Sequence, residues 1–293
     1  MIRKETVLSV PQYDSFMYWF KIEHDVVYVY SKTDCILIAE RSEDGSTLTA
    51  ISEPLDEIHM REILFNWDMY RQRFEYKVHE DVSIGNKSMD DLIDLYESLL
   101  IGSTMIIDEA SGRNPDKSVD MLFKCLDWLR TTDFYKCPAS TKYHDSSTCG
   151  LLVHTLRVVS RCKDLAKSPL FEYGVKIASA VRACLLHDWC KIGLYEPYLK
   201  NVKSSYTGEW EQECSYKYRE ERSVCMGHGT SSMFMANRFL RLSYDEALAI
   251  RWHMGRWNVC ESEIVELRQA NLNYPLVLLV QFADQLSIVN YLP

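Results

Sequence analysis

Two hydrophobic patterns divide the chain. Between residues 26 and 51, β-branched and aromatic residues form three short runs that turn signals at 31–34 and 43–46 separate, which is typical of a small meander of strands. Residues 56–75 carry apolar side chains at roughly helical spacing. A further helix is expected to begin at Ser88, because acidic residues follow it and favour the positive end of a helix.

From residue 116 onward the pattern is helical almost throughout. The polar stretch 108–117 precedes it, and we place a domain boundary there: residues 1–115 form a small α+β domain of unknown role, and residues 116–293 form a second domain. The helices of the second domain are predicted over 118–131, 150–166, 174–190, 231–241, 244–254, 261–270 and 275–291. Ser243-Tyr244-Asp245-Glu246 is a capping box that opens the fifth of these. Residues 198–220 alternate instead and turn at Thr207-Gly208, so the predicted fold is mainly α, a helical bundle with an inserted β-hairpin.

The composition is that of a globular protein. The chain has 293 residues, of which 47% are hydrophobic and 26% charged, with only 11 Gly and 8 Pro. No apolar run approaches the length of a membrane span, and the first residues lack the apolar stretch of a signal peptide, so we expect a cytoplasmic protein with no membrane partner. The ten cysteines contain no Cys-x-x-Cys pair, and reduced thiols are expected rather than a disulfide framework.

The net charge of −9 is unevenly distributed. Residues 1–115 hold 11 Lys and Arg against 22 Asp and Glu, which gives −11, whereas residues 116–293 hold 22 against 20, which gives +2. An acidic half repels a phosphate backbone, and a nearly neutral half has no broad basic surface. Extended nucleic acid is therefore the less favoured partner, while a small anionic substrate needs only a local cluster of cations. The sequence indicates no oligomeric state.

Histidine and aspartate residues interrupt several apolar helical runs. His154 lies in Gly-Leu-Leu-Val-His-Thr-Leu, His187 and Asp188 end Ala-Cys-Leu-Leu, His253 ends Ala-Ile-Arg-Trp-His, and Asp284 interrupts Leu-Val-Gln-Phe-Ala-Asp-Gln-Leu. Each histidine, taken singly, is more often a hydrogen-bonded structural residue. As a set they need another explanation, because ionisable groups on buried helix faces are costly unless they are paired or bind metal. Imidazole and carboxylate together suit Mn, Fe, Co, Ni or Zn, and several helices can converge such ligands.

The order of these residues resembles the H…HD…D signature of the HD-domain metal-dependent phosphohydrolases. The segment Leu-Leu-His-Asp-Trp-Cys-Lys-Ile-Gly (185–193) is similar to the HD-x-x-K-x-G run of that family, and Ser-Thr-Lys-Tyr-His (140–144) resembles the segment before the first histidine of HD-type 3′→5′ exoribonucleases. Gly-His-Gly (227–229) and Arg-Trp-His-Met-Gly (251–255) stand where dinuclear members carry two additional histidines. The resemblance covers about residues 120–290 and implies an HD-domain bundle.

The resemblance also implies a set of metal ligands. A first divalent ion would be held by His154, His187, Asp188 and Asp284, and Asp188 would bridge to a second ion held by His228 and His253. The cofactors expected are thus divalent metals, two in number, drawn from Mn, Fe, Co, Ni, Zn or Mg. An alternative for His228, which lies between two glycines, is that it only caps the helix that begins near Thr230.

Further residues are candidates for catalysis and substrate binding. Asp188 is catalytic as the bridging ligand, and Lys191, about one helical turn later, is expected to reach a phosphate oxygen. His144 is a candidate proton donor or phosphate ligand. Arg157 and Arg251 are candidate anion binders. The alternatives are a solvent-exposed lysine, a loop histidine and ordinary surface arginines, and the aromatic hairpin either covers the site or serves packing.

Three functions remain open at this point. The first is a phosphohydrolase, a phosphomonoesterase or phosphodiesterase, that acts on a nucleotide or another small phosphoester through a metal-activated water. The second is an HD-type 3′→5′ exonuclease on single-stranded nucleic acid, which the segment 140–144 favours and the charge balance opposes. The third is a regulatory module that senses a nucleotide and retains the metal site.

Overall fold

The computed structural model describes the strands at 18–23, 26–31, 37–41 and 48–50, and the residues 77–80, 82–112, 115–143, 145–171, 174–203, 208–221 and 226–289. Helices dominate these residues, which confirms the prediction of a mainly α fold. The helix predicted over 56–75 lies outside the described residues. Within the described ranges, no helix combines the length and hydropathy that crossing a bilayer requires.

The chain divides into two compact units. One takes residues up to Glu80 together with Glu97–Trp128, and the other takes Asp81–Tyr96 together with Leu129–Pro293. The predicted boundary at residue 115 falls within the helical part of the first unit, and the split into 1–115 and 116–293 stays a prediction. All candidate metal ligands belong to the second unit.

The first unit contains an antiparallel meander. Its strands are β1 (Tyr18–Glu23), β2 (Val26–Ser31), β3 (Leu37–Arg41) and β4 (Leu48–Ala50), hydrogen-bonded in that order. A register shift between Val29 and Tyr30 interrupts the pairing of β2 with β3. The meander predicted over 26–51 is thus present, and a strand that the pattern did not predict, β1, precedes it.

The helices follow the predicted positions closely, with shifts at their ends. They are α3 (Met89–Ala110), α4 (Pro115–Thr131), α5 (Gly150–Ala166), α6 (Ile177–Leu186), α7 (His228–Ala236), α8 (Tyr244–Trp252), α9 (Ile264–Asn273) and α10 (Pro275–Ser287), with the short 3₁₀ turns η1 (Trp189–Lys191), η2 (Gly255–Asn258) and η3 (Glu261–Glu263). Ser88 caps α3 as predicted, since its hydroxyl accepts from Asp91 N at 3.2 Å. The main correction concerns 174–190, where the α-helix ends at Leu186 because Asp188 leaves helical geometry (φ −111°) and the chain tightens into η1.

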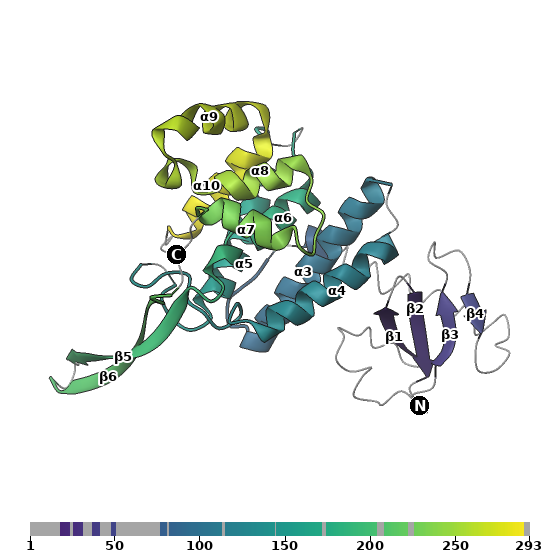
Figure 1. Cartoon of the computed structure of the whole chain (residues 1–293), viewed down its shortest axis with the longest axis horizontal. Coiled ribbons are helices and arrows are strands. Elements are labelled where there is room, and N and C mark those ends of the chain that lie inside the picture. Colours follow the sequence, from purple (N-terminus) through teal and green to yellow (C-terminus); the bar gives the residue numbers. More distant parts are fainter. Residues whose placement is uncertain are drawn as a thin grey trace. The chain divides into compact units, whose positions relative to one another are not determined.

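The core of the second unit forms where four helices meet. α10 packs against α5, α8 and α6, α6 also packs against α5 and α8, and α7 packs against α8 and η1 (Figure 1). The facing side chains are aliphatic and fully buried, as Leu152, Val181 and Leu279 illustrate. Burial of such a side chain contributes about 1.5–3 kcal/mol, so the apolar faces of these helices hold the bundle together.

A buried ion pair ties α6 to α8. Arg182 donates from Nε and Nη2 to the two carboxylate oxygens of Glu246 at 2.8 and 2.7 Å, and both side chains are closed to solvent. Glu246 also completes the predicted capping box, because Ser243 N donates to its Oε2 at 2.8 Å. One carboxylate therefore joins two helices and closes the start of α8.

The predicted hairpin is present at the expected place. β5 (Tyr195–Lys203) and β6 (Trp210–Tyr218) pair antiparallel along their whole length, from Tyr195 opposite Tyr218 to Lys203 opposite Trp210. It projects from the helices of its unit (Figure 1), and only its base approaches the candidate site, through Tyr195 and Tyr218.

Candidate metal centre

The turn after α6 presents His187 and Asp188 to the interior of the bundle. Both residues are buried, and the turn that carries them is anchored by polar contacts. Trp189 Nε1 donates to the Tyr96 hydroxyl at 2.9 Å, and that hydroxyl donates to Leu185 O at 3.0 Å. These contacts hold the backbone on both sides of the His-Asp pair in one position.

The other side of this turn is held by two more hydrogen bonds. Cys190 N donates to Ser232 Oγ of α7 at 3.0 Å, and Gly193 N donates to Asp133 Oδ1 at 2.7 Å. Gly193 has φ +67°, a left-handed conformation that glycine adopts without strain. The glycine in the 185–193 segment therefore lets the chain turn sharply from the site into β5.

The side chains of two helices, α5 and α10, converge on this turn. His154 Nε2 from α5 lies 3.5 Å from Asp188 Oδ2 and 3.2 Å from Asp284 Oδ1 of α10. His187 Nε2 lies 3.3 and 3.8 Å from the same two oxygens. Ligands bonded to one ion at about 2.0–2.2 Å stand roughly 2.8–3.6 Å apart, so these four separations are close to those within a coordination shell.

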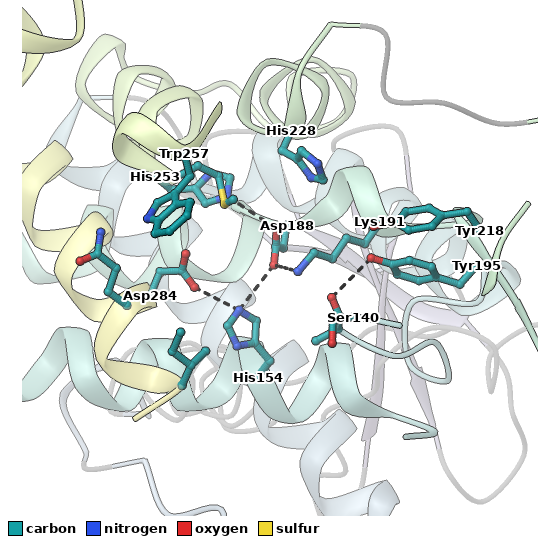
Figure 2. A pocket seen from close by; sticks show the side chains of 14 residues that line it. Ser140, His154, Asp188, Lys191, Tyr195, Tyr218, His228, His253, Trp257 and Asp284 are labelled. Atoms are coloured by element: carbon teal, nitrogen blue, oxygen red, sulfur yellow. Dashed lines mark hydrogen bonds and ion pairs between the residues drawn. The ribbon is translucent and has the colours of Figure 1, made fainter. Parts of the chain in front are cut away.

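Asp188 offers its second oxygen to a different histidine. Oδ1 faces His253 Nε2, at the C-terminal end of α8, at 3.6 Å, whereas Oδ2 faces His154 and His187. Two groups with the separation of metal ligands result, His154 with His187 and Asp284, and His187 with Asp188 and His253. Figure 2 shows His154, His253 and Asp284 around Asp188.

The histidine rings are oriented by acceptors behind them. His187 Nδ1 lies 2.7 Å from Cys184 O, and His253 Nδ1 lies 2.7 Å from Ile250 O. A carbonyl oxygen can only accept, so Nδ1 is the donor in both rings, and Nε2 is the ring atom that faces the site. Such contacts behind a ring fix the tautomer that binds a metal.

The third ring, His154, is held through a hydroxyl. Ser287 Oγ donates to Asp284 O at 2.7 Å and lies 3.3 Å from His154 Nδ1, so its remaining lone pairs accept the Nδ1 proton. Ser287 stands three residues after Asp284, on the same face of α10. One short helical segment thus supplies a carboxylate and orients the opposite histidine.

Three atoms of the centre lack a hydrogen-bond partner within the part of the chain that the structure describes. They are His187 Nε2, His253 Nε2 and Asp188 Oδ1, all fully buried. Leaving a buried polar atom unpaired costs about 1–3 kcal/mol, and these three lie around one point. Divalent cations bound here would satisfy these atoms, so the buried His and Asp groups fit a metal ion.

The charged groups of the centre influence one another's pKa values. Burial disfavours the ionised form of Asp188, but Lys191 and His187 outweigh this effect and hold the pKa of that carboxyl well below its usual range. Burial acts on Asp284 in the same way, and hydrogen bonding to His154 more than offsets it, so the pKa of Asp284 is also lowered. Both carboxylates are therefore ionised at neutral pH, as metal ligands must be.

A pocket of about 340 Å³ opens onto the centre. Its lining includes His154, Asp188, His253 and Asp284 together with Lys191, whose Nζ lies 2.6 Å from Asp188 Oδ2. Pockets for small organic ligands start at about this size. The centre is thus reached from a small concave site rather than from an open surface.

His228 lies in this pocket, where its ring contacts a thiol. Its Nδ1 is 3.4 Å from Cys190 Sγ, and its ring is half-buried at the first residue of α7 (Figure 2). Burial lowers the pKa of His228, so the ring is neutral and free to act as a ligand through Nε2. The structure brings His228 to the pocket, and its role at a second ion stays a prediction. It makes no side-chain cap for α7, which begins at His228 rather than at Thr230.

The two arginine candidates are not brought to this pocket. Arg157 Nη1 pairs with Asp145 Oδ2 at 2.9 Å, and Arg251 Nη2 pairs with Glu263 Oε1 at 3.0 Å while its guanidinium stacks over Trp252. Neither is among the residues that line the pocket. His144 lies outside the described residues.

Several pocket residues were not singled out from the sequence. They are Ala139, Ser140, Tyr195, Met254, Trp257, Gln285 and Ile288. Gln285 and Ile288 follow Asp284 by one and four residues, which a helical projection of α10 could have indicated. The sequence did not indicate that Trp257 lines a pocket, because a single tryptophan after a helix is ordinarily a packing residue.

No protein-family model matches this chain, no curated protein matches it, and no solved structure matches it. The resemblance to the HD-domain phosphohydrolases therefore stays a prediction based on residue order. The geometry adds an independent fact, which is that residues from positions 154 to 284 gather around one buried point.

Proposed function

We propose that this protein is a metal-dependent phosphohydrolase of the HD-domain type, a phosphomonoesterase or phosphodiesterase that acts on a nucleotide or another small phosphoester. The observation that carries the proposal is the set of unpaired, correctly oriented ligand atoms around Asp188, at the floor of a pocket that also contains Lys191. A buried site with orphaned ligand atoms and an adjacent cation suits a bound metal together with an anionic substrate.

Each residue of the centre has a distinct part in this proposal. His154, His187 and Asp284 would hold one ion with Oδ2 of Asp188, and His253 would hold a second with Oδ1, assisted by His228. Bound there, divalent ions supply an activated water and neutralise the charge that develops on phosphoryl oxygens. Asp188 would connect the two groups of ligands, since its two oxygens face different histidines.

Lys191 supplies the charge on the substrate side. Its ammonium is held at Asp188, in the same pocket, where a phosphoryl oxygen would lie within its reach. The surrounding side chains are largely apolar or buried, and charge–charge interactions are stronger in such an environment than in water. A pocket of about 340 Å³ favours a small ester over a polymer.

Metal analysis followed by a release screen tests the proposal. The purified protein is assayed for bound metals and then incubated with nucleoside mono- and triphosphates, cyclic nucleotides and a 20-mer oligonucleotide in Mn, Co, Ni or Mg. We expect bound divalent metal, and hydrolysis of a small nucleotide that exceeds that of the oligonucleotide. Asp188→Asn should abolish turnover and lower the metal content, whereas Asp164→Asn, an exposed carboxylate of α5, should change neither.

The outcomes separate the alternatives. Shortening of the 20-mer from its 3′ end without release from small nucleotides would replace the proposal by the exonuclease. Metal and nucleotide binding without any turnover would replace it by the sensing module. Protein that retains no divalent metal at all would contradict all three.

A further inference from the structure

The pocket over the metal centre has two chemically different sides. Lys191, Tyr195 and Tyr218 lie together on one side of Asp188, and Trp257 lies on the other, beside His253 (Figure 2). Lys191 is the cation of the first side. Trp257 carries no ionisable group, and neither do the lining residues Met254, Gln285 and Ile288, which neighbour His253 and Asp284 in the chain.

Trp257 is unusual for a tryptophan. It is 85% exposed although it lines the pocket, so it gains little from packing within its own chain. An indole left open at the rim of a site offers a large flat surface to a planar ligand. Trp252, five residues earlier, is 5% exposed and packs normally, so the two tryptophans of this segment differ in exposure.

The backbone places Trp257 at the rim. Gly255 adopts φ +55°, and a Cβ at that position would stand 3.4 Å from Gln281 Oε1. This left-handed residue turns the chain directly after the ligand His253 into η2, which carries the indole. The turn at Gly255, two residues after His253, therefore sets the position of Trp257 relative to the candidate metal ligands.

Two residues at the end of α10, Gln285 and Ile288, line the pocket together with Trp257. Ile288 follows Asp284 by four residues, on the same helix face, and is 45% exposed at the pocket. Gln285 is exposed there as well, and an amide side chain can both donate and accept hydrogen bonds. A flat ring, an apolar contact and one amide are the elements that recognise a nucleobase through its face and its edge.

We infer that Trp257, Ile288 and Gln285 form a nucleobase subsite, with the base stacked on the indole and its edge within reach of the Gln285 amide. The inference deepens the proposed function and rests on it for the position of the phosphate, at the metal ligands and Lys191. The ligand is then a nucleotide, whose charged phosphate and uncharged planar base match the two sides of the pocket.

The hairpin tyrosines fit this subsite less well. The rings of Tyr195 and Tyr218 contact each other at an interplanar angle of 54°, with centroids 5.2 Å apart, so each covers part of the other. Tyr195 is itself buried at 4% exposure. Both stand on the Lys191 side of the pocket (Figure 2), where the phosphate is expected.

Binding of non-hydrolysable ligands to the metal-loaded protein tests the subsite. The probes are the phosphonate analogue of adenosine 5′-monophosphate and the matching ribose 5-phosphonate, titrated by calorimetry. Stacking of one base on an aromatic side chain is worth enough to change affinity roughly 5- to 100-fold. We expect Trp257→Ala to weaken binding of the adenosine analogue by that factor and to leave the ribose analogue unchanged, with most of the affinity restored in Trp257→Phe.

Trp210→Ala is the matched control, because Trp210 is a 72% exposed tryptophan on β6 that does not line the pocket. The Trp210→Ala protein should bind both probes as the wild type does. Equal weakening of both probes by Trp257→Ala, or no weakening of either, would overturn the subsite. A Trp257-dependent preference for the adenosine analogue in a protein that hydrolyses no phosphoester would keep the subsite and overturn the proposed function.

Discussion

Lys191 Nζ and Asp188 Oδ2 stand 2.6 Å apart, three residues from each other in the chain and largely closed to solvent. The same oxygen faces His154 and His187 at 3.5 and 3.3 Å. Burial alone would lower the pKa of Lys191, but Asp188 raises it above its usual value, so the ammonium stays charged. Lys191 is thus a permanent cation at the edge of the proposed metal shell.

Replacement of Lys191 should separate catalysis from metal binding. In Lys191→Gln we expect kcat/KM to fall roughly 10²- to 10³-fold, because one preorganised partner of the phosphoryl oxygens is lost. Metal content should persist, since Lys191 is not a ligand. Lys217→Gln, an exposed lysine paired with Glu196 on the hairpin, serves as control. Wild-type kinetics in Lys191→Gln would remove this residue from the site.

Ser287 tests whether the residue that orients His154 affects metal binding. Ser287→Ala removes the acceptor that orients His154 Nδ1, so the ring is free to rotate or to take the other tautomer. We expect the affinity for divalent metal to fall roughly 10- to 100-fold while the circular dichroism spectrum stays unchanged. Competition with a chelating dye measures this affinity. An affinity equal to that of the wild type would mean that His154 does not ligate the ion.

Metal binding should weaken as pH falls. Burial lowers the pKa of His154, but hydrogen bonds to Asp188 and Asp284 outweigh it, so the net pKa of His154 lies above the usual value. A protonated imidazole cannot bind metal, so protons compete from a higher pH than for an ordinary histidine, which titrates near about 6.5. Titrations between pH 8 and 5.5 should show the affinity falling about tenfold per unit below that pKa. A pH-independent affinity would contradict histidine ligation.

The buried Arg182–Glu246 pair makes a prediction about stability alone. Glu246→Ala leaves the buried Arg182 without its carboxylate partner and opens the cap of α8, so unfolding should become about 3–5 kcal/mol easier. Glu266→Ala, which removes an exposed contact 3.8 Å from Arg251, should cost less than about 1 kcal/mol. Urea unfolding measures both. Similar midpoints for the two variants would show that the buried pair contributes little.

The sequence alone determined the fold class, the order of the elements and the identity of the main ligand candidates. Periodicity of 3.6 or 2 residues follows from local backbone geometry, so α5, the hairpin and the capping box at Ser243 could be placed from neighbouring residues. Ends of elements were less certain, as α6 shows. The pattern predicted a helix through residue 190, yet the α-helix ends at Leu186 because Asp188 leaves helical geometry (φ −111°).

Only the tertiary structure decided which groups meet. His154, Asp188 and Asp284 come from three elements whose contact depends on how apolar faces pack, and no local pattern records that. Tertiary structure also decided where the arginine side chains lie. Arg157 and Arg251 form ion pairs with carboxylates on other segments and do not line the pocket. The exposure of Trp257 also depends on the folded surface. The sequence does not show which hydrophobic side chains remain exposed after folding.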